Sequence, residues 1–229
     1  MSTSIWDPAT PIVLASGNPH KLEEMNALLA GRLRFISLTE AAASRGVKIT
    51  EPAEPGQTFE ANAEIKAVSY ARQLGMACLA DDSGLEIDAL GGRPGVISSH
   101  YCTDGQEAGM TRVQRDTANN QRVLAELGDI APAQRTARFV CVLCLAAMDA
   151  TGQERAILTV RGTFEGRIGL PGTDGAIPRG TNGFGYDPLF LVGPASTQTS
   201  AELSPQAKNR LSHRAAAVEQ LVDRLGVRA

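Results

Sequence analysis

Two adjacent carboxylates that follow a short apolar run are the first candidates for chemistry in this chain. Residues 77–80 are apolar, and Asp81, Asp82, Ser83 and Gly84 come directly after them. This pattern predicts a buried strand that ends in a turn carrying acid groups. Ligands gather at strand ends in α/β proteins, and adjacent carboxylates there suit a hard divalent cation such as Mg²⁺. A solvated Asp-Ser-Gly turn explains the same residues equally well.

A second candidate is an anion site in the turn at residues 16–21, which reads SGNPHK. Residues 12–15 predict a strand before the turn, and Leu22, Met25 and Leu28 recur at helical spacing after it. Backbone amides and the helix dipole attract anions at such a helix start, and Lys21 adds a positive charge. Neither standard glycine-rich nucleotide motif is present, so a purely structural turn is at least as good an explanation.

The third candidate is an aromatic residue between two glycines in a long loop. Residues 169–185 contain too many glycines and prolines for regular structure, and loops of that length in compact domains are usually functional. Gly183 and Gly185 flank Phe184, which allows close backbone approach to a ligand and offers a flat face for stacking. The alternative is that Phe184 only pins the loop to the core.

Cationic side chains form two further groups. Lys208, His213 and Arg214 concentrate positive charge near the start of the last predicted helix, which suits an anion or the edge of a base. Asn62 and Lys66 lie one turn apart on a predicted helix at residues 58–74, so both could point toward one ligand. A solvated surface position is the simpler interpretation of both groups.

The predicted elements give these groups a common frame. Strands are expected at residues 12–15, 34–38, 137–148 and 156–164, with a hairpin at 149–152 between the two long runs. Helices are expected to begin at Thr58, at Asp116 or Thr117, and at Ser212. Long antiparallel strands beside short strand–helix units favour a mixed sheet. We therefore expect an α/β fold, with a long mixed sheet flanked by helices and two lobes around a central substrate cleft.

Composition sets limits on the class of protein. The 229 residues are 43% hydrophobic and 21% charged, which fits one domain over residues 1–229 with residues 1–10 as a loose leader. The net charge of -3 gives no reason to expect nucleic-acid or membrane binding, and no apolar run approaches the ~20 residues that span a bilayer. Cys141 and Cys144 lie in a continuous predicted strand and face opposite sides, which argues against metal binding and fits a reducing cytoplasm.

The order of these motifs is similar to that of one family. Segments 16–21, 58–63 with Lys66, 80–85, 183–188 and 212–214 together resemble the inosine triphosphate pyrophosphatases, the Ham1 or RdgB family, over residues 12–225. The resemblance implies Mg²⁺-dependent hydrolysis of non-canonical purine nucleoside triphosphates (ITP, dITP, XTP) to the monophosphate and pyrophosphate. It also implies a homodimer.

The resemblance further implies roles for individual residues. Asp82 would bind Mg²⁺ and orient or deprotonate the attacking water, and Glu54 would be the second metal carboxylate, although neighbouring Glu51 leaves that choice open. Phe184 would stack on the purine, and His213 and Arg214 would read the edge of the base. The full set of expected substrate-binding residues is Ser16, Gly17, Asn18, Pro19, His20, Lys21, Lys66, Ser83, Phe184, Gly185, Tyr186, Asp187, Lys208, His213 and Arg214.

The chain departs from the usual family pattern in three places. Ala207 precedes Lys208 where many members carry an acid, Asn182 stands where glycine is common, and the segment after Tyr101 is longer than typical. Two other functions remain: a related nucleotide pyrophosphatase with a different base preference, and a nucleotide-binding regulator without catalysis. Asp82 and Lys21, together with an acidic loop at residues 50–57 that contains Glu51 and Glu54, argue against the regulator.

Overall fold

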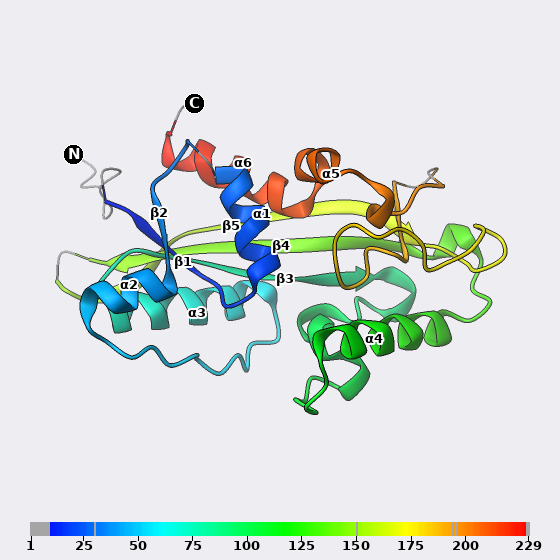
Figure 1. The fold of residues 1–229 in the computed structure, drawn as a ribbon, viewed down its shortest axis with the longest axis horizontal. Helices are drawn as coiled ribbons and strands as arrows, with labels where there is room; N and C mark the ends of the chain where they lie inside the picture. The colour runs from blue at the N-terminus through cyan, green and yellow to red at the C-terminus, as the bar shows by residue number, and fades with distance from the viewer. Residues whose placement is uncertain (1–9, 30, 150, 194, 196, 228–229) are drawn as a thin grey trace. The chain divides into compact units, whose positions relative to one another are not determined.

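The computed structural model describes residues 10–29, 31–149, 151–193, 195 and 197–227 (Figure 1). Nearly all of the expected leader, residues 1–9, lies outside the described residues. The chain divides into two compact units. The first unit contains residues 1–82, 141–162 and 214–229, and the second contains residues 83–140 and 163–213.

The described residues form a six-stranded sheet in the order β2-β1-β3-β4-β5-β6. Its strands are β1 (Ile12–Ala15), β2 (Phe35–Ser37), β3 (Cys78–Ile87), β4 (Thr136–Met148), β5 (Glu154–Ile168) and β6 (Phe190–Val192). β1 pairs in parallel with β2 and β3, whereas β5 pairs antiparallel with β6. The expectation of a mixed sheet is therefore confirmed.

Six α-helices and four short 3₁₀ helices are described. The α-helices are α1 (Pro19–Leu29), α2 (Leu38–Arg45), α3 (Phe59–Leu74), α4 (Arg112–Leu127), α5 (Pro205–Leu211) and α6 (His213–Leu225). The 3₁₀ helices are η1 (Asp88–Leu90), η2 (Gly95–Thr103), η3 (Pro132–Gln134) and η4 (Ser200–Glu202). No helix in the described part of the chain is both long and apolar enough to span a bilayer.

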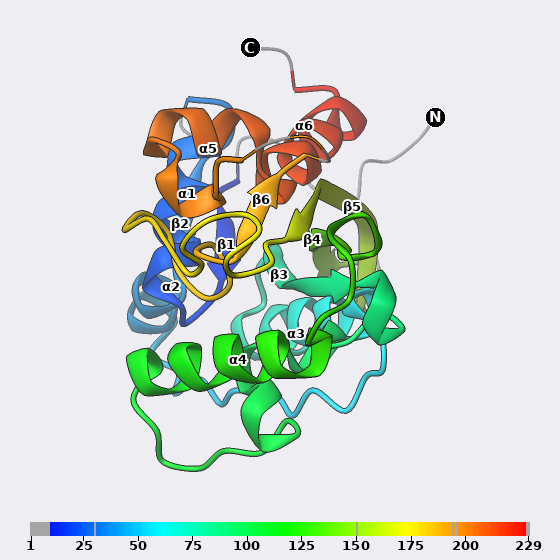
Figure 2. The ribbon, with the colours of Figure 1, turned by 90° about the vertical axis from the view of Figure 1, so that its right-hand side faces the viewer.

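The core of the first unit follows from the alternation of side chains along its strands. Ile12 and Leu14 of β1 share one face and pack with Leu79 of β3 and with apolar residues of α1 and α6. Helix α3 buries its own apolar stripe, which includes Ala63 and Ala67. Figures 1 and 2 show α1 and α6 on one side of this part of the sheet and α3 on the other. Both faces of the sheet are thus covered, as parallel strands require.

The second unit has its own apolar core and one unusual polar group within it. Helix α4 and the long strands contribute Val123, Leu127 and Ile168 among others to this core. Arg135 is fully buried beside them and donates hydrogen bonds to the carbonyl oxygens of Gly128, Ile168 and Gly169, at 3.1, 2.9 and 3.2 Å. These bonds fix the start of the long loop to the end of α4.

The structure corrects three expectations about local structure. No turn forms at residues 81–84, because β3 continues past Asp81 and Asp82 to Ile87. Both carboxylates can lie within a buried strand because Lys21 and Lys66 pair with them. Helix α4 begins at Arg112 rather than at Asp116 or Thr117, since Thr111 and Gln114 form a capping box. The 34–38 strand is shorter than expected, because Ser37 caps α2, a helix that the sequence analysis missed. Helix α5 was also missed.

Candidate active site

A buried lysine joins two carboxylates in the first unit. Lys66 Nζ lies 2.7 Å from Asp82 Oδ1 and 2.8 Å from Glu54 Oε2. Lys66 and Asp82 are only 9% and 8% exposed, so the expectation of a solvated surface position for Lys66 is wrong. Asn62, one turn earlier on α3, is buried too. Lys66 is stable inside because its charge is compensated by hydrogen-bonded carboxylates.

Burial sets the protonation behaviour of this cluster. It raises the pKa of Asp82 to about 6, although the charge and hydrogen bond of Lys66 act in the opposite direction. Burial by itself lowers the pKa of Lys66, but the charges of Asp82 and Glu54 outweigh it and leave that pKa raised. Asp82 is therefore largely a carboxylate, and Lys66 an ammonium, at neutral pH. The buried Asp82 Oδ2 has no hydrogen-bond partner among the described residues, so it is an acceptor that a ligand can use.

The contact to Lys66 distinguishes the two acids of the loop that precedes α3. Glu54 reaches Lys66 directly. Glu51 lies near Tyr70, where burial, then the charge of Glu51 and, more weakly, that of Glu54 raise the pKa of the phenol. In the part of the chain that is described, no group of three or more His, Cys, Asp or Glu side chains could hold a metal ion. A metal site here would rest on Asp82 and Glu54.

A second buried network surrounds Asp81. Its Oδ1 accepts a hydrogen bond from Lys21 Nζ at 2.5 Å, and its Oδ2 accepts from Arg214 Nε at 2.9 Å. Arg214 Nη1 also donates to Glu24 Oε2 at 2.6 Å. Asp81 and Asp82 are neighbours in one strand but have different partners. Asp81 accepts hydrogen bonds from Lys21 and Arg214, whereas Asp82 accepts one from Lys66.

The turn before α1 folds as a compact polar loop. Ser16 Oγ accepts from the backbone N–H of Asn18 at 3.2 Å, and Asn18 Oδ1 accepts from the N–H of Lys21 at 3.4 Å. α1 begins at Pro19, and Gly17 is exposed with open space around its Cα. The side chains of Pro19 and His20 lie outside what the structure describes. The helix start and Lys21 together suit an anion.

In the second unit, Asp187 organises the loop that carries Phe184. Asp187 Oδ2 accepts from the backbone N–H of Phe184 and from Lys208 Nζ, both at 2.7 Å, and its Oδ1 accepts from the Ser200 hydroxyl at 2.8 Å. A Cβ at Gly183 would collide with the same carboxylate, and the φ of Gly183 is +78°, so only glycine fits there. Three predicted residues, Phe184, Asp187 and Lys208, are brought together.

The remaining predicted residues of the second unit have varied surroundings. The buried Tyr186 donates a hydrogen bond from its hydroxyl to Ser98 O at 2.7 Å, so it anchors the Phe184 loop to the 3₁₀ helix η2. The His213 ring stacks on Phe139, with centroids 5.2 Å apart and an interplanar angle of 21°. Ser83 is half-buried in β3, directly after Asp82.

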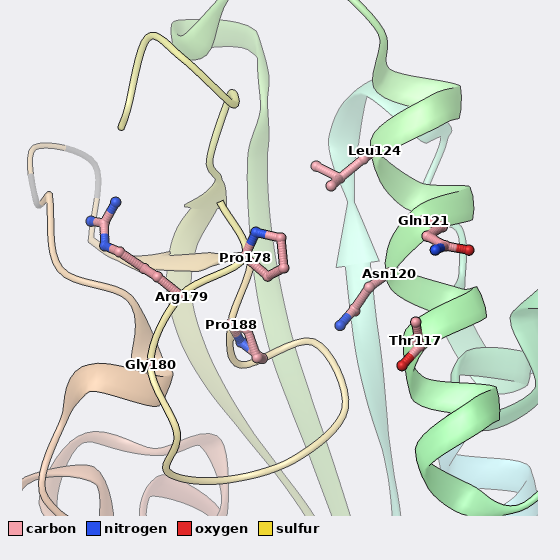
Figure 3. A pocket seen from close by; sticks show the side chains of 8 residues that line it. All are labelled: Thr117, Asn120, Gln121, Leu124, Pro178, Arg179, Gly180 and Pro188. Carbon is pink, nitrogen blue, oxygen red and sulfur yellow. The ribbon is translucent and has the colours of Figure 1, made fainter. Parts of the chain in front are cut away.

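A pocket of about 390 Å³ lies in the second unit between α4 and the long loop (Figure 3). It is lined by Thr117, Asn120, Gln121, Leu124, Pro178, Arg179, Gly180 and Pro188. No predicted site residue belongs to this lining. Asn120 nevertheless connects the pocket to the loop that carries Phe184, because its Nδ2 donates to Gly185 O at 3.1 Å.

Sequence reasoning missed several residues of the site. Glu24 joins Arg214, and Asp116 and Asn120 of α4 bond the backbone of Gly185. The sequence predicts Asp116 only as a possible helix cap. The spacing of four residues between Asp116 and Asn120 places them on one face of a helix, and this spacing is the signal that the sequence offers. Gly185, which both residues contact, lies 65 residues or more away along the chain, so the sequence does not indicate what that face contacts.

Comparison with known proteins shows the family to which the chain belongs. The model of the Ham1 family matches residues 12–224, and the chain belongs to that family. It is 43% identical over 212 residues to the dITP/XTP pyrophosphatase of Exiguobacterium sibiricum, covering 92% of this chain and 94% of that relative. It is 42% identical over 216 residues to the dITP/XTP pyrophosphatase of Pseudomonas aeruginosa, covering 94% and 97%.

Two solved structures share the fold. A HAM1 protein from Coxiella burnetii has a TM-score of 0.75 at 42% identity, with 95% of this chain and 98% of that chain covered. The Ham1 protein of Staphylococcus aureus has a TM-score of 0.73 at 32% identity, covering 94% and 98%. The α/β fold with a mixed sheet, expected from the sequence, is thus the fold of Ham1 proteins.

Proposed function

We propose that this protein hydrolyses the non-canonical purine nucleoside triphosphates ITP, dITP and XTP to the monophosphate and pyrophosphate. The observation that carries the proposal is the buried Asp82–Lys66–Glu54 cluster. It occurs in a chain that is more than 40% identical, over more than 90% of its length, to relatives named dITP/XTP pyrophosphatases. Removal of such nucleotides from the pool would be its biological effect.

Asp82 is the group we assign to the attacking water. Lys66 holds Asp82 Oδ1, which leaves Oδ2 as the acceptor that orients the water or takes its proton. At neutral pH the carboxylate is largely ionised and so able to accept that proton. Phosphoryl chemistry depends mainly on such positioning and on neutralisation of charge.

The residues of this cluster fit a Mg²⁺ ion. Mg²⁺ in nucleotide enzymes is usually held by one or two carboxylates together with substrate phosphates and water, which Asp82 and Glu54 can supply. The unpartnered Asp82 Oδ2 is the observation that favours a ligand there. When bound, Mg²⁺ would neutralise phosphate charge. We propose Asp82 and Glu54 as its protein ligands.

The turn at residues 16–21 is the proposed triphosphate site. Ser16, Asn18 and the backbone at the start of α1 provide donors, and Lys21 provides charge. Asp81 holds the Lys21 ammonium in place, and Arg214 in turn supports Asp81. Lys66 and Lys208 are proposed as further cationic contacts to the substrate.

The loop around Phe184 is the proposed base site. Phe184 offers the stacking face, with Gly185, Tyr186 and Asp187 shaping its surroundings. Ser83 is proposed to contact substrate, and His213 and Arg214 to recognise the edge of the base. A site that donates to a 6-oxo group rejects the 6-amino group of adenine strongly, because mismatched buried polar groups are costly.

Two expectations about the whole protein accompany this function. We propose a homodimer on the basis of the family resemblance. A reducing, cytoplasmic setting is supported by the four cysteines, Cys78, Cys102, Cys141 and Cys144, all of which are free thiols. The net charge of -3 supports a small-molecule partner rather than nucleic acid or an anionic membrane.

Identification of the products tests the proposed bond cleavage. Purified protein incubated with ITP and Mg²⁺ should yield IMP and pyrophosphate, resolved by anion-exchange chromatography. IDP and orthophosphate as the products would place the cleavage at the wrong phosphoanhydride and refute the proposal. Binding of ITP without any product would instead favour the nucleotide-binding regulator.

A further inference from the structure

The acidic loop at residues 50–57 lies along α3 and is attached to it at both ends. At the start of the loop, Gln73 of α3 accepts a hydrogen bond from the N–H of Thr50 at 2.8 Å and donates one to the carbonyl of Thr50 at 2.9 Å. In the middle of the loop, Glu54 Oε2 lies 2.8 Å from Lys66 Nζ. Figure 1 shows the segment between α2 and α3 running beside α3. The loop therefore passes from the last turn of the helix toward its first turn.

Near its end, the acidic loop contacts α3 at a glycine. A Cβ at Gly56 would lie 2.9 Å from Ala61 Cβ and closer still to Asn62 Oδ1, so a larger residue would displace the loop. The φ of Gly56 is outside the left-handed region, so lack of room rather than backbone conformation requires the glycine. Asn62 is 3% exposed, and its buried Oδ1 accepts no hydrogen bond from the described residues. An apolar side chain would fill this place with a smaller loss of stability, so packing alone does not explain the amide.

The three contacts fit an extended chain that runs antiparallel to a helix. The helix rises about 10 Å between the first contact and the second, and about 6 Å between the second and the third. The loop advances by four residues and then by two, which span about 13 Å and about 7 Å when extended. The contacts therefore fix one register. A shift of one residue would carry Glu54 about 3.3 Å away from Lys66 and leave Ala53 or Pro55 in its place.

The position of Glu54 depends on this register more than the positions of its partners do. The Glu54 side chain is 32% exposed, whereas those of Lys66 and Asp82 are each 11% exposed. Packing fixes the two buried side chains, so the loop backbone determines where the Glu54 carboxylate lies. Any group that sets the register of the loop therefore also sets the distance between the two proposed metal carboxylates, Glu54 and Asp82.

We propose that Gly56 and Asn62 are positioning residues for the divalent cation. Their contact sets the register that brings Glu54 to the cation site beside Asp82. The inference rests on the proposed function, since the site is the one proposed above for Mg²⁺. Neither Gly56 nor Asn62 has a role among those proposed above.

Substitutions on both sides of the contact test the proposal. Gly56→Ala places a Cβ against Asn62, Asn62→Ala removes the side chain that this Cβ meets, and the double variant combines the two changes. Gln57→Ala, at an exposed position of the same loop, is the matched control. Glu54→Gln removes the proposed ligand and identifies the binding that belongs to this site. Mn²⁺ alone, which prefers the same oxygen ligands as Mg²⁺, is titrated into each protein and followed by electron paramagnetic resonance. The melting temperature reports folding.

We expect Gly56→Ala to weaken Mn²⁺ binding about tenfold and Asn62→Ala to weaken it about threefold. Adding Gly56→Ala to the Asn62→Ala protein should weaken binding by no more than about a further twofold, because the nearer of the two obstacles to the new Cβ is gone. The control should match the wild type, and Glu54→Gln should bind more weakly than any other variant. In turnover of ITP, excess Mg²⁺ should restore kcat of Gly56→Ala, which it would not do for a purely structural defect.

Wild-type affinity of Gly56→Ala, the same loss of affinity with and without Asn62, or a kcat that stays low in excess Mg²⁺ would overturn the role of the contact. The proposed function would remain intact in each case. If Gly56→Ala does not fold, Asn62→Ala decides, and an unchanged Kd for Mn²⁺ in that variant overturns the role. Failure of the wild type to bind Mn²⁺ would remove the cation site and this inference with it. The proposed function fails separately, if the wild type releases no pyrophosphate from ITP.

Discussion

Lys66 and Asp82 form a buried ion pair, with Lys66 Nζ 2.7 Å from Asp82 Oδ1. The pair joins the middle of α3 to the middle of β3, and Glu54 extends it to the loop before α3. One carboxylate oxygen of Asp82 is thereby committed to the protein and the other is left to a ligand. This division is what the proposed chemistry requires of a residue that must orient water.

Replacing Asp82 with Asn should abolish turnover without abolishing binding. The amide keeps the size of the side chain but cannot accept the proton of the attacking water, so kcat for ITP should fall by about 10²–10⁴-fold. Calorimetric titration with ITP should still detect binding. Asp223→Asn, at an exposed position on α6, is the control and should behave as the wild type. Near-normal turnover of the Asp82 variant would show that the catalytic assignment is wrong.

Replacing Phe184 with Ala should act mainly on KM. Stacking of a base on an aromatic ring contributes about 1–3 kcal/mol, so loss of the ring should raise KM for ITP about tenfold or more. Phe184→Tyr preserves the flat face and should stay within about threefold of the wild type. Steady-state kinetics of the three proteins make the comparison. An unchanged KM in the Ala variant would remove the stacking role.

Replacing Arg135 with Met should destabilise the protein without touching the site. Three or more buried carbonyl groups lose their donor, which we expect to lower the free energy of unfolding by about 3 kcal/mol. Urea unfolding followed by circular dichroism measures the change. Arg155→Met removes an exposed guanidinium and should shift stability by no more than ~0.5 kcal/mol. Similar losses in both variants would refute the special role of Arg135.

Asp174 should make stability depend on pH in the acid range. Its bidentate hydrogen bonds with Arg167, at 2.6 and 2.7 Å, lower the pKa of the carboxyl from 3.8 to about 2. Because the folded pKa is below the unfolded one, the stabilisation is complete above about pH 4 and is lost as pH falls toward 2. It amounts to at most ~2 kcal/mol at neutral pH after allowance for solvent screening.

Unfolding curves between pH 2 and pH 7 compare the wild type with Asp174→Asn. The variant should be less stable at pH 7, and its difference from the wild type should shrink below pH 4. Asp129→Asn, at an exposed position, is the control. A difference that is constant over the whole range would contradict the assigned pKa.

Local patterns in the sequence predict α3 at both ends, because its caps are distinct. The ends of α3 follow from Thr58, whose hydroxyl accepts from Ala61 N–H, and from Gly75 in the left-handed conformation. The capping box of Ser37 and Glu40 marks the start of α2 equally well, but it directly follows the apolar residues of β2, whose pattern predicts a strand as far as residue 38. Caps are local, so they can be read without knowledge of the fold.

The pairing of charges could not be predicted in the same way. The partners of Asp81, Lys21 and Arg214, lie 60 and 133 residues away along the chain, so no spacing rule relates them. The sequence predicts Lys66 at the surface, because a lysine is buried only where carboxylates compensate its charge. Those carboxylates come from β3 and from the acidic loop, which lie next to Lys66 only in the folded protein. Such residues become interpretable only when the sheet order is known. The arrangement of two lobes around a cleft stays a prediction.

The proposed function requires selectivity for non-canonical purines and cleavage at the bond between the α and β phosphorus atoms. The most direct measurement is kcat/KM for pyrophosphate release in Mg²⁺ from ITP, XTP, ATP, GTP and a methylated pyrimidine triphosphate. We predict values for ITP and XTP at least about 100-fold above those for ATP and GTP. Comparable turnover of ATP or GTP, or a preference for the modified pyrimidine, would contradict the account.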